Sequence, residues 1–147
     1  MTAIDTNLLI IGAGPFGMAM AASARHLGID TLIVGEPMGF WRKHMPDGML
    51  LRSASDWPLD PLGVHTIEAY LREQQLRPAD VEPLSRDFYL SYVDWFQDQK
   101  NIVPQPLYIT RLDQIADSPY RFQASTRDGG ELPSTLEAGI GLCPRST

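Results

Sequence analysis

Residues 12–17 read Gly-Ala-Gly-Pro-Phe-Gly and directly follow an apolar run at residues 8–11. A second apolar run, at residues 31–34, is followed by a single acid, Glu36. A glycine-rich turn between a strand and a helix binds phosphate through backbone N–H groups, and an acid about 20 residues further on binds a ribose. The chemistry that this spacing favours is therefore recognition of a dinucleotide.

Each residue of the motif has its own expected task. Gly12 permits the tight turn after the strand, Gly14 lets a pyrophosphate approach the backbone, and Gly17 lets the helix pack close to the sheet. Pro15 suits the first helical turn, where no N–H is needed, and the positive end of the helix dipole then faces the pyrophosphate. Glu36 can accept hydrogen bonds from both ribose hydroxyls and would repel a 2′-phosphate. The site therefore fits the adenosine half of FAD or NAD better than that of NADP.

The motif requires a strand–helix–strand unit to position it. Strands are expected at residues 8–11 and 31–34, joined by a helix that Gly28 terminates. Residues 37–64 show no clean period, and a stretch of this length without regular structure is usually functional in a compact domain. We therefore expect this stretch to contribute to the site.

Two helices are predicted beyond this stretch. Thr66 is typical of the N-cap of a short helix, and Ser85 of a longer one. Aromatic residues along the longer helix recur at i, i+4, i+7 and i+8, which indicates one face packed on a core. These aromatic residues are Phe88, Tyr92, Trp95 and Phe96. Residues 77–83 are expected to form a loop.

Strand patterns return in the last third of the chain. Residues 107–112 and 120–126 favour two strands of an antiparallel meander, followed by a turn at residues 128–130. Residues 102–103 could form a short parallel strand. No strand-like pattern follows residue 132.

The predicted fold class is α/β. We expect a Rossmann-like open parallel sheet with an added antiparallel β-meander, and without its final strand. The expected organisation is an incomplete nucleotide-binding domain at residues 1–132 and an irregular, poorly packed C-terminal tail at residues 133–147.

Composition narrows the classes of partner. The chain of 147 residues has a net charge of −6, which argues against nucleic acid or an anionic membrane as a partner. Its one cysteine, Cys143, excludes a disulfide framework and favours a cytoplasmic location. Residues 8–24 carry no charge, but no basic residue precedes them and glycines and a proline interrupt them, so we do not expect a signal peptide or a membrane anchor. No metal site is expected.

The sequence resembles the N-terminal FAD-binding part of flavoproteins that have two dinucleotide-binding domains. The most similar group is the flavin-dependent monooxygenases, including the N-hydroxylating kind. The resemblance rests on residues 12–17, on Glu36, on residues 40–53 (Phe-Trp-Arg-Lys-His-Met-Pro-Asp-Gly-Met-Leu-Leu-Arg-Ser) and on the aromatic helix at residues 85–96. It extends over residues 6 to 132.

This resemblance implies an FAD site and an NAD(P)H-dependent oxidoreductase, with NADPH or NADH as reductant. The residues that it places at the pyrophosphate and the ribose are Gly12, Gly14, Pro15, Phe16, Gly17 and Glu36. Those that it places along the flavin half are Trp41, His44, Met49 and Arg52. No catalytic side chain is implied, since the redox chemistry belongs to the flavin.

The chain also departs from this family. It has no second Gly-x-Gly-x-x-Gly motif for the nicotinamide cofactor, and no cysteine pair follows Glu36, which excludes the dithiol-reductase branch. Two alternatives to an FAD-binding module of a monooxygenase therefore stay open. One is a truncated, non-catalytic nucleotide-binding remnant that pairs with a complementing chain or self-associates. The other is an NAD-binding module, because one glycine motif with one acid does not separate FAD from NAD.

Overall fold

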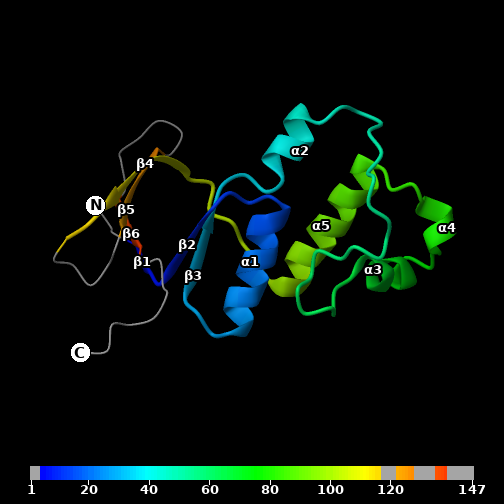
Figure 1. The fold of residues 1–147 in the computed structure, drawn as a ribbon, viewed down its shortest axis with the longest axis horizontal. Helices are drawn as coiled ribbons and strands as arrows, with labels where there is room; N and C mark the ends of the chain where they lie inside the picture. Colours follow the sequence, from blue (N-terminus) through cyan, green and yellow to red (C-terminus); the bar gives the residue numbers. More distant parts are fainter. Residues whose placement is uncertain (1–3, 117–121, 128–134, 139–147) are drawn as a thin grey trace.

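The computed structural model of the chain describes residues 4–116, 122–127 and 135–138. Strands and helices alternate in the first third, helices fill the middle, and strands return at the end (Figure 1). The strands are β1 (Ile4–Thr6), β2 (Leu8–Ile11), β3 (Thr31–Val34), β4 (Tyr108–Gln114), β5 (Phe122–Arg127) and β6 (Thr135–Ala138). The helices are α1 (Pro15–His26), α2 (Gly39–His44), α3 (Ile67–Glu73), α4 (Pro78–Val81) and α5 (Arg86–Lys100).

The strand–helix–strand unit forms as predicted. β2 and β3 pair in parallel, in register from Leu8 opposite Thr31 to Ile11 opposite Val34, and α1 connects them. Gly28 follows the helix with a φ of +71°, a left-handed conformation that glycine adopts without strain. The short parallel strand expected at residues 102–103 lies slightly further along the chain: an isolated parallel bridge joins Val34 to Gln105.

The second sheet has the order β1-β6-β5-β4. The predicted meander is confirmed, because β4 and β5 pair antiparallel, with a bulge between Ile109 and Arg111. The expectation that no strand follows residue 132 is wrong. β6 lies between β1, with which it pairs in parallel, and β5, with which it pairs antiparallel. Two predicted features lie outside the described residues. One is the turn at residues 128–130, and the other is the rest of the tail, namely residues 133–134 and residues 139–147 with Cys143.

Strand β6 shows how tertiary context can override local propensity. Its four residues, Thr-Leu-Glu-Ala, alternate between polar and apolar but contain only one β-branched residue, so the local signal for a strand is weak. β-propensity reflects packing and pairing with neighbours more than an intrinsic backbone preference. Two neighbouring strands offer backbone partners to this segment at once, and that pairing is not visible in a local sequence window.

Helices α3 and α5 begin at the N-cap residues that the sequence predicted. The Thr66 hydroxyl accepts from the N–H of Ala69, and the Ser85 hydroxyl from that of Phe88, both at 3.1 Å. On α5, Tyr92 and Phe96 are fully buried, which confirms the aromatic face.

Two short helices occupy segments where none was predicted. α4 is one turn inside the expected loop at residues 77–83, with Pro78 in its first turn and the Asp80 carboxylate accepting from the N–H of Arg77. α2 begins three residues after Glu36, within the stretch that has no period, and none of its residues is fully buried. It therefore lacks the apolar periodicity by which a helix is recognised in a sequence.

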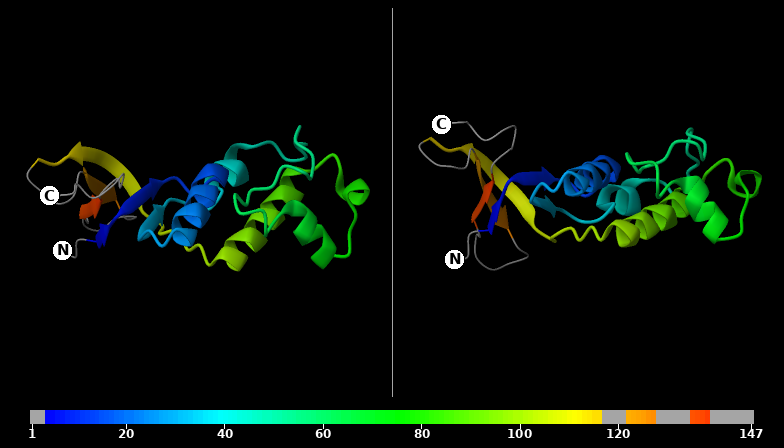
Figure 2. Two further views of the ribbon diagram at one scale, coloured as in Figure 1. Left: turned by 60° about the horizontal axis from the view of Figure 1, so that its bottom comes forward. Right: turned by 90° about the horizontal axis from the view of Figure 1, so that it is seen from below.

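The molecule is elongated, with the four-stranded sheet at one end, the β2–α1–β3 unit in the centre and α3, α4 and α5 at the other end (Figures 1 and 2). A large apolar core joins α1 to the helical end. A small second cluster, Leu9, Val34 and Ala124, joins β2 and β3 to β5. Among the described residues, no helix is long and apolar enough to cross a membrane.

Candidate functional site

The glycine turn after β2 holds the start of α1 against the end of the strand. Gly12 has a φ of +111°, which residues with a side chain rarely adopt. A Cβ on Gly17 would lie 2.0 Å from the Gly12 carbonyl oxygen, whereas a Cβ on Gly14 would meet no heavy atom within 4 Å. The turn is therefore closed where helix meets strand and open at Gly14.

The N-terminus of α1 is free to bind an anion. Pro15 occupies the first turn, no side chain caps the helix, and the first turn contains no acid. The N–H of Met18 donates to the carbonyl of Gly14. Within the described part of the chain, the preceding N–H groups of Phe16 and Gly17 have no acceptor. These unpaired donors add to the positive end of the helix dipole.

The loop after β3 is fixed to the glycine turn. Met38 is buried, has a left-handed φ of 53°, and donates its N–H to the Ala13 carbonyl at 2.8 Å. The Gly35 backbone approaches the same turn, since a Cβ there would lie 3.2 Å from the Ala13 nitrogen. Glu36 is thereby held beside the glycine turn by backbone contacts on both sides of it.

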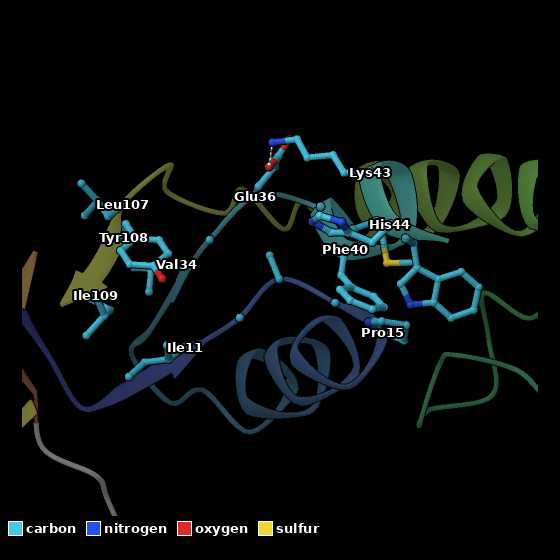
Figure 3. Close-up of a pocket in the computed structure, with 17 residues that line it drawn as sticks. Ile11, Pro15, Val34, Glu36, Phe40, Lys43, His44, Leu107, Tyr108 and Ile109 are labelled. Atoms are coloured by element: carbon cyan, nitrogen blue, oxygen red, sulfur yellow. Dashed lines mark hydrogen bonds and ion pairs between the residues drawn. The ribbon is translucent and has the colours of Figure 1, made fainter. Parts of the chain in front are cut away.

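These segments surround a cleft of about 770 Å³ (Figure 3). Pro15, Phe40 and His44 lie at the helical end of the cleft, and Ile11, Val34 and Tyr108 at the strand end. The residues that line it are Ile11, Gly12, Ala13, Gly14, Pro15, Val34, Gly35, Glu36, Met38, Gly39, Phe40, Trp41, Lys43, His44, Leu107, Tyr108 and Ile109. Volumes of 300–1,000 Å³ are typical of small-molecule and cofactor sites.

The structure places most of the predicted site residues in this one cleft. Those that line it are Gly12, Gly14, Pro15, Glu36, Trp41 and His44. Gly17 lies beneath the turn, against Gly12, where its contribution is to close packing. Phe16 points away: its side chain is 92% exposed and does not line the cleft.

The other two predicted residues, Met49 and Arg52, lie outside the cleft. The Met49 carbonyl accepts from the N–H of Arg86, and Leu51 donates its N–H to the Leu84 carbonyl, so this segment is fixed to the start of α5. Arg52 lines a separate depression of about 340 Å³, which it shares with Glu82. The pattern of residue types in 40–53 did not reveal that the chain turns away after α2.

Sequence reasoning missed two parts of the cleft. Leu107, Tyr108 and Ile109 close its strand end, although the sequence indicated only that a strand was there. Lys43 was not among the predicted site residues, but its ammonium forms an ion pair with Glu36, with 2.6 Å between Nζ and Oε2. The seven-residue spacing from Glu36 to Lys43 was the available signal, but only the turn at Met38 and helix α2 bring the two together.

An aromatic layer braces the helical end of the cleft. The Trp41 ring packs on Tyr89 of α5, with ring centroids 5.0 Å apart, and Phe40 packs on His44 at 5.4 Å. Burial raises the pKa of Tyr89, in keeping with its place beneath this layer. One side of the Trp41 ring is thus fixed by its packing on Tyr89, while Phe40 is largely exposed.

Comparison with known proteins gives matches at the level of structure. No protein-family model matches the chain, and no curated protein matches its sequence. Among solved structures, a flavin-containing monooxygenase from Stenotrophomonas maltophilia superposes with a TM-score of 0.69 at 20% identity, covering 92% of this chain and 37% of that protein.

Two further solved structures also match most of the chain. The reduced form of ornithine hydroxylase from Pseudomonas aeruginosa gives a TM-score of 0.67 at 18% identity, covering 98% of this chain and 41% of that protein. Bacillithiol disulfide reductase from Staphylococcus aureus gives a TM-score of 0.65 at 18% identity, covering 92% of this chain and 36% of that protein. The chain spans about two fifths of the length of these proteins. It therefore has the fold of one part of flavin-dependent monooxygenases, as the resemblance in its sequence predicted, and shares that fold with a disulfide reductase as well.

Proposed function

We propose that the cleft binds FAD and that the chain is the FAD-binding module of a flavoprotein oxidoreductase of the monooxygenase type. The observation that carries the proposal is the common opening of three features onto one cleft: the bare backbone of Gly14, the uncapped start of α1 and the carboxylate of Glu36. The first two would bind the pyrophosphate and the third the ribose, both in the adenosine diphosphate half of the cofactor.

The residues present fit such a group. The space beside Gly14, where a Cβ would meet nothing, admits a pyrophosphate, and the N–H groups of Phe16 and Gly17 supply donors for it. Glu36 can accept from the ribose hydroxyls, and Leu107–Ile109 offer an apolar wall at the strand end for the adenine. No metal ion is needed to bind the diphosphate in this scheme.

The flavin half would extend toward the helical end of the cleft. Trp41 offers a flat apolar surface that Tyr89 holds in place, and His44 offers a ring nitrogen that can donate. When bound, FAD supplies the redox chemistry, and the protein binds it, orients it and limits its contact with water. Met49 and Arg52 have no role in this proposal, because the cleft does not include them.

The reaction of the whole protein is a further part of the proposal. Monooxygenases are prominent among the structural neighbours, and the chain has a single cysteine, so we favour NAD(P)H-dependent oxygenation over dithiol reduction. The nicotinamide cofactor would bind elsewhere, since this sequence contains one glycine fingerprint. A cytoplasmic location fits the same chemistry.

The proposal is tested by titrating the purified chain with FAD and following the quenching of flavin fluorescence. Glu36→Ala should weaken FAD binding by roughly 1–3 kcal/mol, or about 5- to 150-fold, because it removes a charge-assisted hydrogen bond. Glu68→Ala is the matched control: Glu68 is exposed in the first turn of α3 and does not line the cleft. Equal FAD affinity for the two variants would contradict the proposed site, and absence of FAD binding by the wild-type chain would contradict the function.

A further inference from the structure

Lys43 and Glu36 form an ion pair inside the proposed nucleotide cleft. Both residues line it, and the dashed contact in Figure 3 joins the Lys43 ammonium to the Glu36 carboxylate. We propose that Lys43 is a positioning residue that holds this carboxylate ready for the ribose hydroxyls of an adenosine nucleotide. The inference rests on the proposed function and adds a residue to its site.

The Glu36 carboxylate has a defined position because two neighbours fix it. A Cβ on Gly39 would lie 2.9 Å from Oε2 of Glu36 and 3.0 Å from its Cβ, so the glutamate side chain is folded over the start of α2. The Lys43 ammonium, from the last turn of α2, then contacts Oε2 at 2.6 Å. Since a carboxylate has acceptor positions on both oxygens, Oε1 is left to accept from a ligand.

The energetic reason for such a contact is preorganisation. The Glu36 side chain is about half exposed, and without a partner it would sample several rotamers that binding must then freeze. Immobilising one flexible side chain weakens binding by about 2- to 10-fold. Lys43 also offsets the negative charge of Glu36 close to where a diphosphate would bind, which reduces like-charge repulsion.

The neighbouring residue Arg42 provides a matched control. Its long cationic side chain also forms an ion pair at 2.6 Å, but the partner is Asp94 on α5, and Arg42 does not line the cleft. Both pairs are exposed, and exposed ion pairs contribute little to stability. Lys43→Met and Arg42→Met should therefore both fold, which thermal melting will verify.

The test compares binding of ADP with that of 2′,3′-dideoxy-ADP, measured by isothermal titration calorimetry on the full chain. Lys43→Met should weaken ADP binding about 2- to 10-fold more than it weakens binding of the dideoxy analogue, because only ADP uses the held carboxylate. Arg42→Met should change neither affinity. Lys43→Arg keeps the positive charge and should therefore keep the wild-type preference for ADP over the dideoxy analogue. When Glu36→Gln is already present, Lys43→Met should no longer alter that preference.

Two results would overturn the positioning role. The first is an unchanged affinity of Lys43→Met for ADP. The second is an equal loss for both nucleotides, which would show that Lys43 acts on the diphosphate alone. A wild-type chain that binds FAD and ADP yet gives either result refutes this inference and leaves the proposed function standing, whereas a wild-type chain that binds neither refutes both.

Discussion

At the residue scale, Gly14 and Gly17 of the same turn are needed for different physical reasons. Gly17 is required by the protein itself, because its α-carbon packs on the Gly12 carbonyl. Gly14 has a φ of −86° that any residue can adopt, and nothing in the described structure fills the space beside it. A glycine that the fold does not need, at the mouth of a cleft, is best explained by a ligand that must approach the backbone.

This contrast predicts opposite outcomes for two substitutions. Gly14→Val should abolish FAD binding with little change in melting temperature, since its side chain enters open space in the cleft. Gly17→Ala should lower the melting temperature clearly, because its Cβ would overlap the Gly12 carbonyl oxygen. Circular dichroism melts and FAD titrations measure both effects. Unaltered FAD affinity in Gly14→Val would show that the phosphate lies elsewhere.

At the scale of elements, one buried carboxylate connects the loop before α3 to helix α5. Asp60 is inaccessible and accepts from the N–H groups of Leu62, Val64 and His65, while Lys100 of α5 pairs with it at 2.9 Å. Burial alone would raise the pKa of Asp60. The hydrogen bonds from His65, Lys100 and Leu62 and the charge of Lys100 outweigh it and lower that pKa to about 2.

The lowered pKa of Asp60 predicts how stability depends on pH. Because the folded pKa is below the ordinary value of 3.8, the carboxylate stabilises the fold above about pH 4, and this contribution is lost as the pH falls toward 2. The loss should be about 2 kcal/mol. Urea unfolding at pH 4, 3 and 2 measures it.

The control for this prediction is an exposed aspartate on the same helix as Lys100. Asp60→Asn should flatten the acid limb of the stability curve, even though it destabilises the protein near neutral pH by leaving Lys100 without its partner. Asp98→Asn should keep the wild-type slope. If Asp60→Asn keeps that slope as well, other carboxylates govern the acid sensitivity.

At the scale of the whole molecule, the chain packs as two unequal parts. The large core connects α1 with α3 and α5, and the four-stranded sheet contacts the rest through the small cluster of Leu9, Val34 and Ala124. Stability is seldom uniform across such a structure, because units with few buried contacts open at lower free energy. The sheet end should therefore open independently of the helical end.

Strand β6 allows this independence to be measured. Leu136→Pro removes a backbone donor from a strand that is paired on both sides, opposite Ile4 and Ala124. Hydrogen exchange should then accelerate at the amides of β5, while those of α5 around Val93 and Phe96 keep their protection. Leu136→Val, which retains the donor, should exchange like the wild type. Equal loss of protection in α5 would show that the molecule opens as one cooperative unit.

The sequence by itself determined the elements whose signals are local. The order of apolar runs and glycines specified β2, α1 and β3, and the hydroxyls of Thr66 and Ser85 marked the starts of two helices. These features depend on backbone geometry and hydrogen bonding within a few residues, which is why a short window of sequence reveals them. The same rules indicated Gly14 and Glu36 as candidates for a nucleotide site.

Only the tertiary structure decided which distant segments meet. Pairing with β1 and β5 makes a strand of residues 135–138, and contacts with the start of α5 direct Met49 and Arg52 away from the cleft. The bond from the N–H of Met38 to the Ala13 carbonyl fixes the residue at which α2 begins, and α2 then places Lys43 on Glu36. Each of these outcomes depends on free energy gained between residues far apart in the chain, and a short window of sequence does not reveal that gain.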